Sequence, residues 1–211
     1  MYLGSLTIDD FLDRLGSADP TPGGGALAAL AGAQAAAMLA MVCNLTIGRP
    51  RFADVETAVR AQLQRCIELR QQLMHLADAD AAAYGSVRDA YRLPRSTDED
   101  RSARAAAIEA AMQQATDVPA QTAEAARAVL TVGLAVAELG NPSVLPDVSV
   151  ATHVATAALR GGAIQAEYNL PSLKTEDFAN RMRRRVEAAT SGVDSLGADI
   201  LATVRRRSAS V

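Results

Sequence analysis

Apolar and small side chains recur along the chain at alternating spacings of three and four residues, the periodicity of amphipathic α-helices. No segment shows the strict alternation of apolar and polar residues that is typical of a half-buried strand. The pattern predicts seven helices, over residues 7–16, 23–48, 53–92, 96–118, 119–139, 146–168 and 175–207. We therefore expect an all-α fold, one helical bundle that occupies residues 1–211 as a single domain.

Local signals place the ends of these helices. Thr7, with Asp10 three residues later, predicts an N-terminal cap. Pro119 has no backbone donor, so we expect it to kink or restart the helix around it. The run 140–142, Gly-Asn-Pro, is the next break, and Asp147 is interpreted as the N-cap of the helix that follows.

The segment 23–48 carries no charged residue and is long enough to span a membrane. It consists mostly of Ala and Gly, which contribute little transfer free energy, and it has neither an aromatic belt nor a preceding basic flank. Its small residues recur every four positions, a spacing that lets helix backbones approach closely. We therefore expect a buried, Ala/Gly-rich central helix and no membrane association.

Composition narrows the class of protein further. Ala fills 45 of 211 positions, and 49% of residues are hydrophobic while 3% are aromatic, which favours helices over strands. The net charge of −3 gives no electrostatic indication of a nucleic-acid partner. Cys43 and Cys66 lie in apolar helical patterns and are interpreted as reduced core thiols. With no secretory signal at the N-terminus, the sequence predicts a cytoplasmic protein.

Two charged residues interrupt the apolar seam of the helix predicted over 53–92. They are Arg70 and Asp80, which lie about 15 Å apart along a helix and so are not direct partners. A carboxylate on an apolar seam costs several kcal/mol unless it is paired or hydrogen-bonded. Asp80 is therefore either a structural hydrogen-bonding hub or a functional acid or base.

Other candidate chemistry is sparse. The nucleophile-elbow, zinc-protease, P-loop and C-x-x-C motifs are absent. His75 is expected to face solvent and His153 to lie in the core or in an interface, so no metal site is predicted. Three consecutive glycines, 23–25, permit close approach of a ligand to a helix N-terminus, although tight helix packing explains them equally well.

These residues lie within a pattern that resembles the cyclodeaminase/cyclohydrolase family. The family comprises the C-terminal domain of formiminotransferase-cyclodeaminase and stand-alone methenyltetrahydrofolate cyclohydrolases. The matching motifs, in order, are 20–26 (PTPGGGA), 41–49 (MVCNLTIGR), 80–84 (DAAAY), 93–94 (LP), 118–119 (VP), 140–142 (GNP) with Asp147, and 169–172 (NLPS). The resemblance covers nearly the whole chain.

The resemblance implies a dimer with a folate site in a cleft near the dimer interface. Two reactions are possible: hydrolysis of 5,10-methenyltetrahydrofolate to 10-formyltetrahydrofolate, or ring closure of 5-formiminotetrahydrofolate with release of ammonia. Both need proton transfer and a carboxylate that balances the substrate's charge, and neither needs a metal or a cofactor besides the folate. No formiminotransferase domain accompanies the motifs, which favours the cyclohydrolase.

Roles are assigned to residues by chemical type within this resemblance. The catalytic candidates are Asp80 and Asp147. The residues expected to bind substrate are Pro22, Gly23, Gly24, Gly25, Asn44, Asn141 and Asn169, with Arg49, Arg51 and Lys174 available for the glutamate tail. Asn141 and Asn169 are equally well interpreted as turn residues.

The sequence departs from the family pattern at several of these motifs. Pro146 replaces the usual Ser, Gln165 the usual Asn and Thr175 a frequent Asp, and 49–51 is Arg-Pro-Arg where the family is lysine-rich. A third hypothesis therefore stands beside the two enzymes: a non-catalytic folate-binding protein or helical scaffold.

Overall fold

The computed structural model describes residues 2–209, which form α-helices and short 3-10 turns without a strand. The α-helices are α1 (Ile8–Leu15), α2 (Gly24–Asn44), α3 (Glu56–Tyr91), α4 (Asp98–Leu139), α5 (Pro146–Asn169), α6 (Glu176–Thr190) and α7 (Val193–Ser208). The 3-10 turns are η1 (Leu3–Ser5), η2 (Pro50–Val55), η3 (Pro142–Val144) and η4 (Leu170–Ser172). The predicted all-α fold is confirmed.

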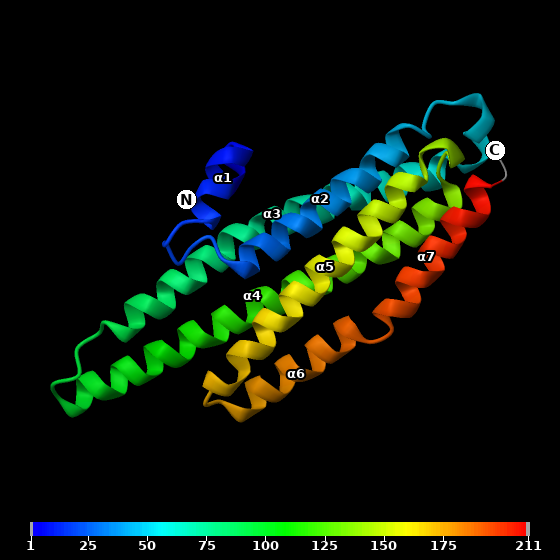
Figure 1. The fold of residues 1–211 in the computed structure, drawn as a ribbon. Coiled ribbons are helices and arrows are strands. Elements are labelled where there is room, and N and C mark those ends of the chain that lie inside the picture. Colours follow the sequence, from blue (N-terminus) through cyan, green and yellow to red (C-terminus); the bar gives the residue numbers. More distant parts are fainter. Residues whose placement is uncertain (1, 210–211) are drawn as a thin grey trace.

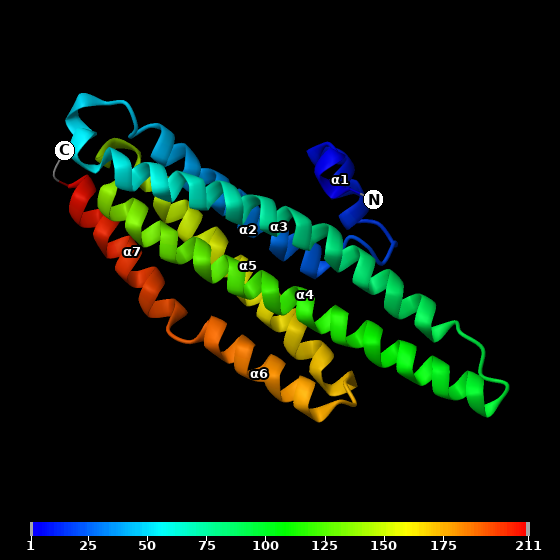
Figure 2. The same ribbon diagram turned by 180° about the vertical axis from the view of Figure 1, so that it is seen from behind.

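Four long helices form the body of the bundle (Figure 1). α2 and α4 contact each other, and both of them pack against α3 and α5. α6 and α7 cover the side made by α4 and α5. The α3–α4 hairpin projects beyond the end of α2, and α1 stands apart from the bundle in both views (Figure 2). The projecting end of this hairpin is therefore not covered by α2.

The central position of α2 depends on its small residues. A Cβ at Gly32 would lie 3.1 Å from the Leu73 side chain on α3 and 3.4 Å from Ala158 on α5, so both neighbours touch the α2 backbone. By length and composition α2 could cross a membrane, since its most apolar stretch has a mean hydropathy of 1.9, but 56% of this stretch is buried in the bundle. The prediction of a central core helix is confirmed.

Two helix boundaries differ from the prediction. Pro119 neither breaks nor restarts the helix, because α4 runs through it without interruption. The helix predicted over 175–207 is instead divided into α6 and α7, where Gly192 adopts a left-handed φ of +66°. At the N-terminus, the Thr7 side chain accepts a hydrogen bond from the Asp10 backbone N–H at 3.1 Å, as predicted.

Pro119 is tolerated because a side chain replaces its missing hydrogen bond. In a regular helix the N–H of residue 119 would donate to the carbonyl of Ala115, and proline has no N–H to offer. The Asn169 Nδ2 donates to that carbonyl oxygen at 2.8 Å instead. A residue at the end of α5 therefore satisfies the acceptor that Pro119 leaves free in α4.

This compensation makes the effects of two substitutions interdependent. Asn169→Ala should lower the free energy of unfolding by about 1–3 kcal/mol, because a partly buried carbonyl loses its donor. In a Pro119→Ala background the restored backbone N–H reaches Ala115, and the same change should cost close to nothing. Urea denaturation of the four proteins of this cycle measures the coupling. Equal costs in both backgrounds would contradict the compensation.

Candidate active site at the N-terminus of α2

The helix α2 begins without a cap from its own segment. Gly23 is the N-cap residue and has no side chain to accept the first backbone N–H groups. Asp80, 54 positions away on α3, takes this role: its Oδ2 accepts a hydrogen bond from the Ala26 N–H at 3.0 Å. The carboxylate therefore lies at the positive end of the α2 dipole.

Two glycines of α2 leave room for side chains from both neighbouring helices. A Cβ at Gly25 would lie 2.0 Å from Asp80 Oδ1, and one at Gly24 would lie 2.7 Å from Gln165 Nε2 on α5. A real Cβ at Gly25 would collide with the whole Asp80 carboxyl group, whereas one at Gly24 would meet only the flexible end of Gln165, which could move aside. Glycine at position 25 therefore gives Asp80 the room to rest on the backbone. The sequence analysis offered helix packing as an alternative explanation of these glycines. Packing does explain them here, because the side chains that pack against them are those of the candidate site.

The environment of Asp80 leaves its charge largely uncompensated. Burial raises the pKa of this carboxyl above its ordinary value, and the hydrogen bond from Ala26 offsets only part of that effect. Within residues 2–209 no cationic side chain pairs with Asp80, and its Oδ1 accepts no hydrogen bond. A half-buried carboxylate with one free oxygen suits a cationic ligand or a proton transfer.

Gln165 is a polar group beside Asp80 to which the sequence analysis gave no role. Its side chain is half-buried, and its amide forms no hydrogen bond with the described part of the chain. The signal that could have indicated it is a long polar side chain among small residues, with glycine at 161 and 162 and alanine at 163 and 166. The amide is free to bind a ligand that reaches Asp80.

The structure divides the expected site residues between the two ends of α2. At the end where Asp80 lies are Pro22, Gly23, Gly24, Gly25, Asn169 and Lys174, and at the other end are Asn44, Arg49, Arg51, Asn141 and Asp147. α5 runs antiparallel to α2, and 18 residues separate Asp147 from Gln165, which corresponds to about 27 Å. One chain therefore does not bring Asp80 and Asp147 into a common site.

Asn141 is engaged in the protein, as is Asn169. Its backbone N–H donates to Thr46 Oγ1 at 2.9 Å, and its Nδ2 donates to the Leu45 carbonyl at 3.3 Å. Its Oδ1 accepts from the Ser143 N–H at 3.2 Å. The side chain thus fastens the turn before α5 to the end of α2.

The interpretation of Asp147 as an N-cap is wrong. α5 begins one residue earlier, at Pro146, whose fixed φ suits the first helical position, and Leu145 is the N-cap. Asp147 lies in the first turn, half-buried, without a capping hydrogen bond. Its carboxylate is still favoured there by the helix dipole.

The remaining candidates are exposed. Arg49, Arg51 and Lys174 form no ion pair within residues 2–209, and the Arg51 guanidinium lies 5.4 Å from the Phe52 ring centroid.

His75 faces solvent as expected, whereas His153 is exposed and does not lie in the core of this chain. In the same part of the chain, no group of three His, Cys, Asp or Glu residues is placed to share a metal ion.

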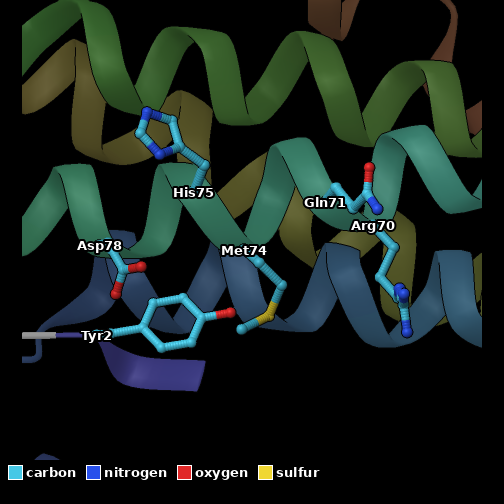
Figure 3. A pocket seen from close by; sticks show the side chains of 6 residues that line it. All are labelled: Tyr2, Arg70, Gln71, Met74, His75 and Asp78. Carbon is cyan, nitrogen blue, oxygen red and sulfur yellow. The ribbon is translucent and has the colours of Figure 1, made fainter. Parts of the chain in front are cut away.

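A pocket on the outer face of α3 lies away from Asp80 (Figure 3). It has a volume of about 620 Å³, and its lining comes from α3 and from Tyr2: Tyr2, Arg70, Gln71, Met74, His75 and Asp78. Asp78 is already used in the fold, because its Oδ1 accepts a hydrogen bond from the Leu3 N–H at 2.7 Å. His75 and Asp78 are titratable groups of this pocket, but Asp80 has both a free oxygen and a pKa that burial raises, so it is the stronger acid–base candidate.

Comparison with known proteins now decides the family. The family model described as formiminotransferase-cyclodeaminase matches residues 7–188. The chain belongs to this family. A methenyltetrahydrofolate cyclohydrolase of Methylorubrum extorquens is 39% identical over 204 residues, which are 97% of this chain and 98% of that protein.

Other members of the family are longer or more distant. The formimidoyltransferase-cyclodeaminase of Rattus norvegicus is 29% identical over 197 residues, 93% of this chain but 36% of that protein. The crystal structure of a formiminotetrahydrofolate cyclodeaminase from Thermotoga maritima has a TM-score of 0.86 at 24% identity, covering 96% of this chain and 98% of that one. The fold is therefore that of the family along almost the whole chain.

A methyl group at Gly25 tests the contact between α2 and Asp80. Gly25→Ala should displace the Asp80 carboxylate, break its hydrogen bond to Ala26 and lower the melting temperature, because the added Cβ would lie 2.0 Å from Oδ1. Gly85→Ala is the matched control: its Cβ meets nothing within 4 Å, and alanine should stabilise α3 by up to about 1 kcal/mol. Thermal denaturation compares the two, and equal stabilisation by both would show that Asp80 does not rest on Gly25.

The raised pKa of Asp80 predicts the direction of a pH effect on stability. Folding favours the protonated carboxyl, so the ionised group destabilises the native state at neutral pH, and this cost is lost as pH falls below the folded pKa. Asp80→Asn should therefore raise the melting temperature at pH 7, and the gain should shrink toward acidic pH. A lower melting temperature at pH 7 would mean that the ionised carboxylate stabilises the fold.

Proposed function

We propose that this protein is a methenyltetrahydrofolate cyclohydrolase. The observation that carries the proposal is the Asp80 carboxylate, half-buried without a cationic partner and fixed at the glycine-rich start of α2. The cation that such a site fits is the amidinium of 5,10-methenyltetrahydrofolate. The 39% identity to a methenyltetrahydrofolate cyclohydrolase over almost the full length of both chains supports the same substrate.

The reaction follows from the placement of one carboxylate and one amide. Asp80 balances the substrate's positive charge and takes a proton from water as the water oxygen bonds to the amidinium carbon. Gln165 orients that water through its free amide. The tetrahedral intermediate then collapses: the hydroxyl oxygen forms the carbonyl as the bond from the carbon to N5 breaks, N5 receives the proton from Asp80, and the carbon remains on N10 as the formyl group. One further proton is released to solvent.

The cyclodeaminase reaction is the second candidate, and the family supports it as well. It closes the same ring from 5-formiminotetrahydrofolate and expels ammonia, so the carboxylate would act on a related tetrahedral carbon. The chain spans 36% of the Rattus norvegicus formimidoyltransferase-cyclodeaminase but 98% of the Methylorubrum extorquens cyclohydrolase. The higher identity, 39% against 29%, favours hydrolysis; coverage does not separate the reactions, because the chain also covers 98% of the Thermotoga maritima cyclodeaminase.

A homodimer would complete the site. Asn44, Arg49 and Arg51 lie at the opposite end of α2 from Asp80, about 30 Å away along the helix. A two-fold axis that crosses the middle of α2 would bring the partner's Arg49 and the partner's Asn44 toward the glycine end of this chain. The folate's glutamate tail would then meet arginine while its amidinium meets Asp80. We place this dimer in the cytoplasm, with no cofactor besides the folate substrate.

The deciding experiment follows the absorbance of the methenyl chromophore. Purified protein should accelerate its loss from 5,10-methenyltetrahydrofolate and should not generate it, with ammonia, from 5-formiminotetrahydrofolate. Chromophore gain with ammonia would make the protein a cyclodeaminase, and no change with either substrate would support the non-catalytic scaffold. Dialysis against EDTA should leave the rate unchanged.

Asp80→Asn tests the assigned carboxylate. Turnover should fall by about 10²-fold or more, because the variant keeps the shape but loses the proton acceptor. In the native enzyme, kcat/KM should rise with pH through a pKa above the ordinary aspartate value of 3.8, and this acidic limb should vanish in the variant. Asp147→Asn is the companion; a large loss there with full activity in Asp80→Asn would transfer the role to Asp147.

A further inference from the structure

The helix α1 is amphipathic but contributes little to the core of its own subunit. Ile8 is 78% exposed and Leu12 is 54% exposed, on a helix that stands off the bundle (Figures 1 and 2). Its polar side is acidic, with Asp9, Asp10 and Asp13. An isolated helix of eight residues is marginal in water, so its apolar side needs a surface to pack on.

Between α1 and the bundle lies an apolar cleft of about 310 Å³. One side of it is formed by Ile8 and Leu12, and the other by Leu27 and Leu30 of α2 with Met74 of α3. Leu27 is 46% exposed in this cleft. The cleft therefore has two apolar walls, and no other part of residues 2–209 fills the space between them.

The same face of the bundle continues along α2 into a second groove. This groove between α2 and α3 has a volume of about 430 Å³ and is lined by Met41, Leu63 and Ile67, with Arg70 at its edge. Figure 3 shows Tyr2, Met74 and Arg70 following one another along this face. Arg70 also lines the pocket shown in Figure 3 and forms no ion pair within the described residues.

We propose that α1 is a clasp that packs into the α2–α3 groove of a second copy of this chain. The clasp rests on the homodimer of the proposed function. The cleft adjoins the first half of α2 and the groove adjoins its second half, so a two-fold axis near Gln34 places each α1 over the partner's groove. The lengths agree, since α1 is about 12 Å long and the stretch 37–45 that lines the groove spans about the same.

Charge favours this occupant over a membrane. The acidic side of α1 matches the unpaired Arg70 at the partner's groove, and Asp13 is the candidate partner for it. Helices that lie on anionic lipid surfaces are rich in Lys or Arg, whereas α1 has three aspartates and a single arginine, Arg14, and is acidic overall. The groove, with Arg70 at its edge, therefore suits an acidic helix such as α1 of a second copy.

The first experiment measures the dissociation constant of the dimer by sedimentation equilibrium. The double variant Ile8→Asp with Leu12→Asp should raise it by at least about 100-fold, because two apolar side chains lose their buried surface. Far-UV circular dichroism should change little, since α1 lies outside the core. Asp9→Asn, on the polar side, is the control and should leave the dissociation constant unchanged. An unchanged constant in the double variant overturns the clasp.

A charge exchange identifies the partner surface. Arg70→Asp should weaken the dimer by a few fold, and adding Asp13→Arg in the same chain should restore it, because the pair is re-formed across the interface with reversed sign. Failure of the second change to restore affinity removes Arg70 and Asp13 from the clasp.

The outcomes separate the clasp from the proposed reaction. A dimer that depends on Ile8 and Leu12 in a protein without cyclohydrolase activity supports the clasp and rejects the function. An active protein that sediments as a 22.0 kDa monomer, or that binds lipid vesicles through α1, rejects the clasp and leaves the reaction standing.

Discussion

The close approach of two helices, α3 and α5, to the backbone of α2 is the constraint on which this structure depends. It holds only where α2 has no bulky side chain, because Leu73, Ala158, Asp80 and Gln165 all occupy space that a larger residue at positions 24, 25 or 32 would fill. The same closeness lets a carboxylate from α3 reach the first N–H groups of α2. The glycines thus allow the helices to pack closely and also make room for the candidate catalytic carboxylate. The two explanations that the sequence offered, helix packing and a functional site, therefore hold together.

Much of the fold could be predicted because its signals are local. Helix periodicity, the Thr7 cap and the Ala/Gly-rich central helix each follow from residues near one another in the chain. The continuation of α4 through Pro119 depends on a contact that a linear pattern does not contain, whereas the division of the last predicted helix follows a left-handed φ at Gly192. Pro119 continues α4 because Asn169, 50 positions later, supplies a donor, and that partnership appears only when α5 packs on α4.

The candidate site was predictable in its residue types more than in its arrangement. Asp80 was identified because a charge interrupts an apolar seam, and the structure adds what its carboxylate contacts. Gln165 was missed as a participant because a glutamine on a helix has no distinctive spacing. The separation of Asp80 from Asp147 follows from the antiparallel course of α2 and α5, which a list of motifs in order does not reveal. The motifs follow one another along the sequence, whereas α2 and α5 run in opposite directions in the bundle, so residues at matching places in their motifs lie at opposite ends.

The uncompensated charge of Asp80 links occupancy of the site to the integrity of the whole molecule. Without a ligand, the native state bears the cost of a buried carboxylate that has only one backbone donor. A cation bound beside it removes part of that cost, and any ligand that binds only the native state stabilises it. The resistance of the protein to unfolding in the cell would therefore follow the supply of its substrate, and a chain starved of folate would be the one most readily degraded.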